Sequence, residues 1–218
     1  MTFSKKKKII RFGDKMKLDD KIIREALKIR LNQYKDCYVF EEFTVPSGKA
    51  RADLVAVNGH FTGYEIKSDF DSFQRLASQV VEYDKVFEKN YIVVGEKYSK
   101  TIKNHIPDYW GIIKVTGENP DSISIKFLRK AKLNPRFSFY EFAYLLPSND
   151  LKYIAKEMPI LSKTYKKTEI QTMMKQEIIL LINEKANNSQ KLNIKKIIRM
   201  VYKNHLIKNL YKKGALLV

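Results

Sequence analysis

The stretch "RADLVAVNGHFTGYEIKSD", residues 51–69, decides the fold of this chain. It holds two short β-rich runs joined by an Asn-Gly turn, the pattern of an antiparallel hairpin. Asp53 stands at the entrance of the first run, which is apolar except for Arg51 and Asp53, and Glu65 and Lys67 lie two positions apart in the second. Alternate side chains of a strand share a face, so Glu65 and Lys67 project together, and antiparallel pairing can bring Asp53 beside Glu65.

The segments around this hairpin predict an α/β core. A helix is expected at 18–32 from its apolar spacing and from Asp19 and Asp20 at its start, and a second helix at 71–89. A meander of three strands between two helices, followed by further strands, gives a mixed central sheet flanked by helices. The remaining expected elements are strands at 37–45, 50–59, 61–68, 91–95, 110–116 and 122–130, and a short helix at about 98–106.

Beyond Pro135 the pattern becomes helical, with "ANNSQ" at 186–190 as the clearest linker. We therefore divide the chain into a basic N-terminal arm at 1–17, a core at 18–135 and a basic helical C-terminal region at 136–218.

The net charge of +18, from 42 basic and 24 acidic residues, indicates a polyanionic partner. Nucleic acid is the first expectation, with DNA favoured over RNA, and an anionic membrane surface is the second. Because 34 of the basic residues are lysines, codon bias is an alternative source of the charge. The residues predicted to contact nucleic acid are Arg51, Lys5, Lys6, Lys7, Lys8, Lys195, Lys196, Arg199 and Lys203.

Several other classes are disfavoured by the composition. No apolar run approaches the roughly 20 residues of a membrane-spanning helix, and the start of the chain lacks the apolar run of a signal peptide. We therefore expect a cytoplasmic protein without a membrane partner. Cys37 is the single cysteine and the three histidines are scattered, which leaves carboxylates as the metal ligands to consider.

Asp53 and Glu65 are the carboxylates that matter, because burying two adjacent negative charges is costly unless they are paired or bind a cation. Mg²⁺ or Mn²⁺ would supply the counter-charge and activate a water molecule, and Lys67 would orient that water or stabilise charge on phosphorus. The competing interpretation is a salt-bridged trio on a strand surface. Arg51 has two interpretations as well: a contact to phosphate, or an ion pair with Glu65 or Asp69.

"Asp53, eleven residues, Glu65-Ile66-Lys67", framed by a helix before and a helix and strand after, resembles the PD-(D/E)XK, or restriction-endonuclease-like, nuclease superfamily. Ala52 replaces the proline of that name. Residues 51–87 are also similar to a family of bacterial and phage proteins within the superfamily that are usually regarded as nucleases. The resemblance covers roughly residues 20–150 and is strongest over 51–95.

The resemblance implies roles at matching positions. Asp53, Glu65 and the carbonyl of Ile66 would be metal ligands, and Lys67 would be the catalytic lysine. The superfamily often places a further acid on the first strand, where alternation lets only one of Glu41 and Glu42 face the cleft, and we favour Glu42. Gln79 and Tyr83 match a catalytic glutamine and tyrosine on the following helix, although two such residues four apart are often only helix neighbours.

The function expected from these residues is that of a metal-dependent deoxyribonuclease that hydrolyses phosphodiester bonds with a metal-activated water, with a homodimer left open. One alternative is a non-catalytic nucleic-acid-binding or regulatory module that retains the nuclease fold. Another is a phage-encoded factor that acts on a host complex.

Overall fold

The structure is a computed structural model, and it describes residues 18–117 and 122–203. The predicted basic arm, with Lys5, Lys6, Lys7 and Lys8, lies outside the described residues.

A six-stranded sheet in the order β1-β2-β3-β4-β5-β6 forms the centre of the molecule. The pairs β1–β2, β2–β3 and β5–β6 are antiparallel, whereas β3–β4 and β4–β5 are parallel. The predicted α/β class with a mixed sheet flanked by helices is therefore confirmed. The strands are β1 (Tyr38–Thr44), β2 (Arg51–Val57), β3 (Phe61–Lys67), β4 (Lys89–Val94), β5 (Gly111–Thr116) and β6 (Ser124–Arg129).

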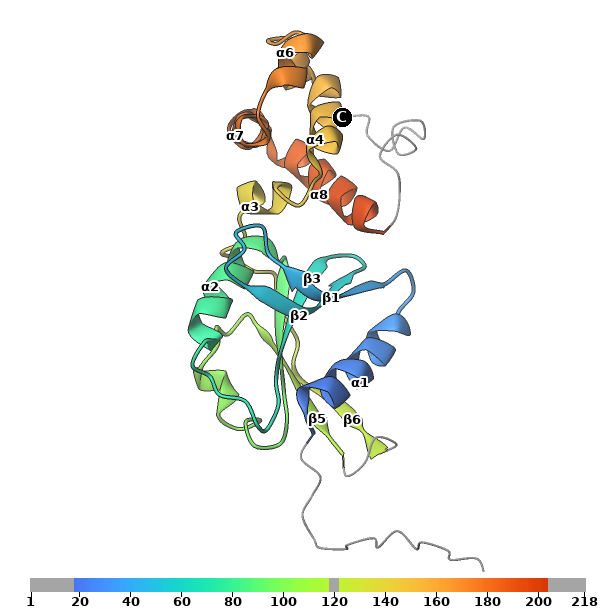
Figure 1. The fold of residues 1–218 in the computed structure, drawn as a ribbon, viewed down its shortest axis with the longest axis vertical. Coiled ribbons are helices and arrows are strands. Elements are labelled where there is room, and N and C mark those ends of the chain that lie inside the picture. The colour runs from blue at the N-terminus through green and yellow to red at the C-terminus, as the bar shows by residue number, and fades with distance from the viewer. Residues whose placement is uncertain (1–17, 118–121, 204–218) are drawn as a thin grey trace, which may run out of the picture.

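Helices α1 (Asp20–Asn32) and α2 (Leu76–Val86) cover opposite faces of this sheet (Figure 1). The N-cap of α1 is Asp19, whose carboxylate accepts the Ile22 N–H at 2.8 Å. The buried stripe of α1 consists of residues four apart that pack against Leu54, Tyr64 and Ile66 of β2 and β3; these are Ile23, Leu27 and Leu31. The β2–β3 hairpin therefore lies between α1 on one face of the sheet and α2 on the other.

Two predicted helices are shorter than their patterns suggested. The helix expected from residue 71 begins only at Leu76, because the Asp71 carboxylate accepts the Ser68 N–H at 2.8 Å and holds a turn there instead. The segment at 98–106 contains a single 3-10 turn, η1 (Ile102–Asn104).

Residues 139–202 of the described chain form six further helices, which lie together beyond the β1 side of the sheet (Figure 1). Their apolar side chains, among them Phe142, Ile178 and Ile197, join the same core cluster as Phe61, Phe87 and other residues of the sheet. The helical region therefore shares a core with the α2 face. The helices are α3 (Phe139–Ala143), α4 (Ser148–Glu157), α5 (Pro159–Ser162), α6 (Lys167–Thr172), α7 (Lys175–Lys185) and α8 (Asn188–Tyr202).

No helix among the described ranges is both long enough and apolar enough to cross a membrane.

Candidate functional site

The β2–β3 hairpin brings Asp53 and Glu65 together at its open end. The last pair of the ladder is Leu54 with Tyr64, so Asp53 and Glu65 are the next opposite residues. The Asp53 carboxylate accepts the Ile66 N–H at 2.6 Å, in the place where the ladder stops. Ile66 thus presents its N–H to this carboxylate, and the implied role of its carbonyl as a metal ligand stays a prediction.

Glu65 is 2% exposed, and protein donors hold both of its carboxylate oxygens. Lys67, also buried, donates from Nζ to Oε1 at 2.6 Å. The Tyr83 hydroxyl lies against Oε2 and 2.9 Å from the Arg51 carbonyl. Burial, together with Glu65, raises the pKa of Tyr83 well above its ordinary value, so the hydroxyl keeps its proton as a donor. Glu65, Lys67 and Tyr83 therefore form one buried hydrogen-bonded group.

Asp53 is neutralised differently. Its burial, and then the charge of Glu65, raise the pKa of Asp53 to about 7, while the Ile66 N–H and Arg24 act in the opposite direction. Near neutral pH a large fraction of the molecules therefore carries a proton on Asp53. That proton removes one of two adjacent negative charges, which is the task that the sequence analysis assigned to a metal ion.

Arg24 of α1 connects Asp53 to the first strand. Its guanidinium donates to Asp20 at 2.8 Å, to Asp53 at 3.4 Å and to Glu42. Arg51 forms a 2.6 Å ion pair with the same Glu42, in place of Glu65 or Asp69. Sequence reasoning missed Arg24, because a lone arginine on an amphipathic helix resembles any solvated position.

Glu42 has a left-handed backbone, with φ of 52° in the middle of β1. This conformation is unfavourable for a residue with a side chain, and it breaks the alternation of the strand. As a result, both neighbouring glutamates point toward α1. Glu42 accepts a hydrogen bond from Arg24, and Glu41 accepts one from Lys28 at 2.7 Å. The regular alternation of side chains between the two faces of a strand, which was the basis for favouring Glu42 over Glu41, therefore does not hold in β1.

A cavity of about 490 Å³ opens beside the acidic pair. Asp53, Glu65 and Lys67 line it, and so does Gln79 of α2, whose Oε1 atom is buried without a hydrogen-bond partner among the described residues. The predicted residues Asp53, Glu65, Lys67 and Gln79 thus meet in one cavity. Three exposed cations also line it: Lys49 and Arg51 around the start of β2, and Arg75 at the start of α2.

The predicted nucleic-acid contacts in α8 are mostly engaged with the rest of the protein. Lys195 and Arg199 approach Glu88 at 3.2 and 2.7 Å. Lys203 pairs with Asp36 and is 8% exposed. Lys196 is exposed, so it alone of these four presents a free surface position.

The fold and this site define an α/β protein with an internally held acidic pair, of which Glu65 is buried and Asp53 half-buried, beside a cationic rim. The chain belongs to the family described as "Bacteriophage P4 protein cII", whose family model matches residues 15–214. It is similar to "Protein cII" of Enterobacteria phage P4, with 29% identity over 125 residues that cover 57% of this chain and 47% of that protein. The match thus spans about half the length of this relative. No solved structure matches the chain.

This family membership corrects the predicted activity. The prediction of a deoxyribonuclease, a hydrolase, is wrong, because the matching family and relative are described as cII proteins and neither description names a nuclease. The metal-binding expectation also lacks support, since the described residues contain no group of three or more His, Cys, Asp or Glu side chains that could hold a metal ion. The PD-(D/E)XK resemblance and the choice of Mg²⁺ or Mn²⁺ stay predictions.

Proposed function

We propose that the chain is a non-catalytic regulatory protein that binds DNA through the cationic rim of its sheet core. The observation that carries this proposal is the meeting of Lys49, Arg51 and Arg75 at the mouth of a cavity in which protein donors already hold the Asp53 and Glu65 carboxylates. The cII family membership supports a regulatory protein over an enzyme.

The rim supports contact with the phosphate backbone. Lys49 lies in the β1–β2 turn, Arg51 begins β2, and Arg75 is the N-cap residue of α2, so two segments distant in the sequence bring cations to one opening. Lysine and arginine side chains that neutralise phosphates release counterions from DNA, and this contribution is independent of sequence. We therefore expect affinity with a strong dependence on salt and little base readout from this surface.

The acidic pair is compatible with a nearby phosphate only when its charge is balanced. Lys67 and Tyr83 hold Glu65, whereas the Ile66 N–H and Arg24 hold Asp53. A buried hydrogen-bonded group of this kind stabilises one arrangement of the hairpin end. In this proposal Asp53, Glu65 and Lys67 shape the rim and position Arg51, whose carbonyl lies 2.9 Å from the Tyr83 hydroxyl.

The order of elements supports the finer proposal of a restriction-endonuclease-like core. A helix, three antiparallel strands, a helix and a parallel strand follow one another from α1 to β4. This is the arrangement that the sequence resemblance implied. DNA as the ligand rests on the net charge of +18 and on the rim, and a homodimer stays a prediction.

The test compares two charge-reversed double variants in fluorescence anisotropy with a labelled DNA duplex. Lys49→Glu with Arg75→Glu removes two cations of the rim. The matched control, Lys126→Glu with Lys130→Glu, makes the same charge change at exposed positions on or next to β6, at the opposite edge of the sheet.

We expect the rim variant to bind at least about tenfold more weakly and to lower the slope of log K against log salt by about 2, since each phosphate contact contributes nearly one unit. The control should lose much less affinity. Equal losses in both variants would show that net charge alone drives binding and would overturn the rim.

A further inference from the structure

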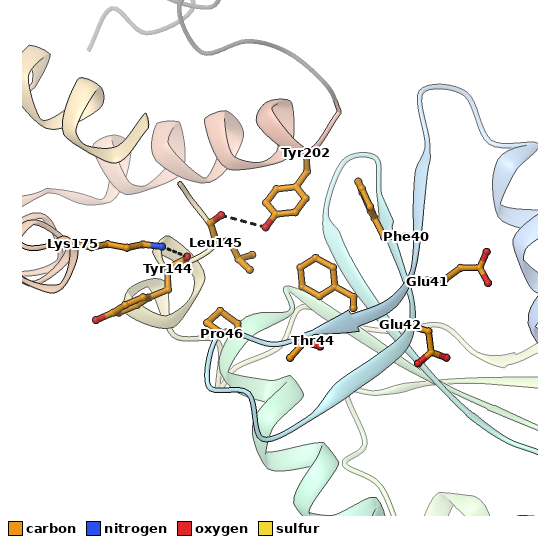
Figure 2. A pocket seen from close by; sticks show the side chains of 10 residues that line it. Phe40, Glu41, Glu42, Thr44, Pro46, Tyr144, Leu145, Lys175 and Tyr202 are labelled. Carbon is orange, nitrogen blue, oxygen red and sulfur yellow. Dashed lines mark hydrogen bonds between the residues drawn. The ribbon is translucent and has the colours of Figure 1, made fainter. Parts of the chain in front are cut away.

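A second pocket, of about 460 Å³, lies between the free edge of β1 and the helical region (Figure 2). Within the described part of the chain, β1 has a strand neighbour on its β2 side only. The side chains that line this pocket include Phe40, Phe43, Thr44, Tyr144, Lys175 and Tyr202.

The β1 wall of the pocket offers main-chain groups in addition to aromatic rings. Residues 40–44 all line it, but the carboxylates of Glu41 and Glu42 point away toward α1 (Figure 2). An edge strand presents N–H and C=O groups that no neighbouring strand uses. This wall can therefore form hydrogen bonds with a flat polar edge, and it directs no negative charge into the pocket.

Aromatic rings form much of the remaining surface. Tyr202 packs edge-on against Phe40, with ring centroids 5.7 Å apart, and its hydroxyl donates to the Leu145 carbonyl at 3.2 Å, which fixes the ring. Tyr144 comes from the helical side of the pocket, where its ring packs against that of Tyr140 with centroids 5.3 Å apart. Tyr144 and Tyr202 are both only half-buried. Rings that are held in place and still partly wet are suited to stacking against another planar group.

Lys175, at the first turn of α7, adds a positive charge. Its Nζ atom donates to the Tyr144 carbonyl at 2.7 Å and lies 5.3 Å from the centre of the Tyr144 ring. An ammonium group has three donors, and this contact uses one of them. The lysine thus stands at the pocket with donors left for an anionic group next to a stacked ring.

Thr44 links this pocket to the cationic rim, because it lines both the pocket and the cavity beside Asp53 and Glu65. A DNA strand bound at Lys49 and Arg51 would therefore lie next to this pocket. The pocket suits an occupant with three properties: a planar ring for the tyrosines, polar edges for the main chain of β1, and an attached negative charge for Lys175. Those three properties together describe a nucleotide.

We infer that this pocket accepts one unpaired nucleobase of a DNA strand bound at the rim, with its ring against the tyrosines and its phosphate near Lys175. The inference rests on the proposed function. It adds a preference for single-stranded or locally unpaired DNA over uninterrupted duplex. A base within a duplex cannot enter the pocket without losing its pairing and stacking.

The experiment measures anisotropy with a single-stranded oligonucleotide and with the matching duplex, and quenching of a 2-aminopurine base placed in the single strand. The variants are Tyr144→Leu, which keeps an apolar side chain without a ring face, and Lys175→Gln. Lys163→Gln, an exposed lysine in the same helical region, is the control. Thermal unfolding verifies that each variant is folded.

We expect wild-type protein to quench 2-aminopurine and to prefer the single strand. Tyr144→Leu and Lys175→Gln should weaken single-strand binding by about 5- to 100-fold, the range of one lost stacked base, and leave duplex affinity within about twofold. Equal effects on single-strand and duplex binding, or no effect on either, would contradict base binding in the pocket without contradicting DNA binding at the rim. Failure of wild type to bind any DNA would overturn the proposed function as well. Stronger quenching with an RNA strand would overturn the assignment to DNA.

Discussion

Tyr83 of α2 places its hydroxyl on the buried carboxylate of Glu65 in β3, and this contact joins the helix to the acidic end of the hairpin. Lys67 holds the second oxygen of the same carboxylate at 2.6 Å. The helix that the sequence analysis expected to carry catalytic groups therefore anchors the sheet at this point.

Replacing Tyr83 with Phe should lower the free energy of unfolding by about 1–3 kcal/mol, because a buried charged acceptor loses a donor. Urea denaturation gives the value. Tyr109→Phe is the matched control: Tyr109 also donates to a buried carboxylate, at Oδ2 of Asp84, but Tyr109 is half-buried, so water can replace it, and Trp110 and Asn90 still hold Oδ1 at 2.8 and 3.1 Å. A larger loss for Tyr109→Phe would contradict the anchoring role of Tyr83.

Asp53 should make stability fall as the pH rises. Its pKa is raised from 3.8 to about 7, so between these values the folded protein holds a proton that the unfolded chain has released. The stabilisation is complete below about pH 4 and is lost as the pH passes 7. Asp53→Asn should remove this part of the slope, which amounts to at most about 4 kcal/mol. Chemical denaturation from pH 4 to 8 compares the two proteins, and identical slopes would show that Asp53 titrates normally.

Glu88 should stabilise the contact between α8 and the sheet. Although its burial acts in the opposite direction, the Phe61 N–H, Arg199 and Lys195 hold the pKa of Glu88 below its ordinary value. Glu88→Gln removes a buried carboxylate and leaves the half-buried Lys195 and Arg199 without a charged partner, which should cost about 2–4 kcal/mol. Glu157→Gln, which breaks the exposed pair with Lys167, should cost less than about 1 kcal/mol. Equal losses in urea denaturation would argue against a buried anchor.

The left-handed backbone of Glu42 predicts that a glycine variant at this position is more stable than an alanine variant. Glu42→Ala and Glu42→Gly both lose the ion pairs with Arg24 and Arg51, but only glycine adopts a φ of 52° without strain. We expect the glycine variant to be more stable than the alanine variant by about 1 kcal/mol. At Glu41, where φ is not positive, the order should reverse. Thermal unfolding of the four variants measures both differences, and the same order at both positions would contradict the strain.

Much of the fold was predictable because it depends on local patterns. The hairpin at 51–69 identified the meander, and the Asp53–Glu65 juxtaposition follows from its register. The site was harder to predict because its partners come from distant segments. Arg24 reaches Asp53 across 29 positions, and no local pattern marks it among the other charges of α1. Lys195 and Arg199 resemble a free basic face in the sequence, but Glu88 lies 111 positions before Arg199 and is brought beneath it only by folding.

The predicted activity was wrong because the chain belongs to the protein cII family, which residue types alone did not indicate. Asp53, Glu65 and Lys67 are the residue types of a nuclease site, but a sequence does not reveal which protein donors will hold the carboxylates. Tyr83, Lys67 and the Ile66 N–H hold them here.

The central claim, DNA binding without cleavage, is tested most directly by recovering the DNA after binding. Wild type and Asp53→Asn are each incubated with linear duplex and with single-stranded DNA in Mg²⁺, and the complexes are run on native gels before the DNA is extracted and sized. We predict that both proteins shift the DNA and that every recovered strand is full length. Fragments that appear with wild type and disappear with Asp53→Asn would contradict the account.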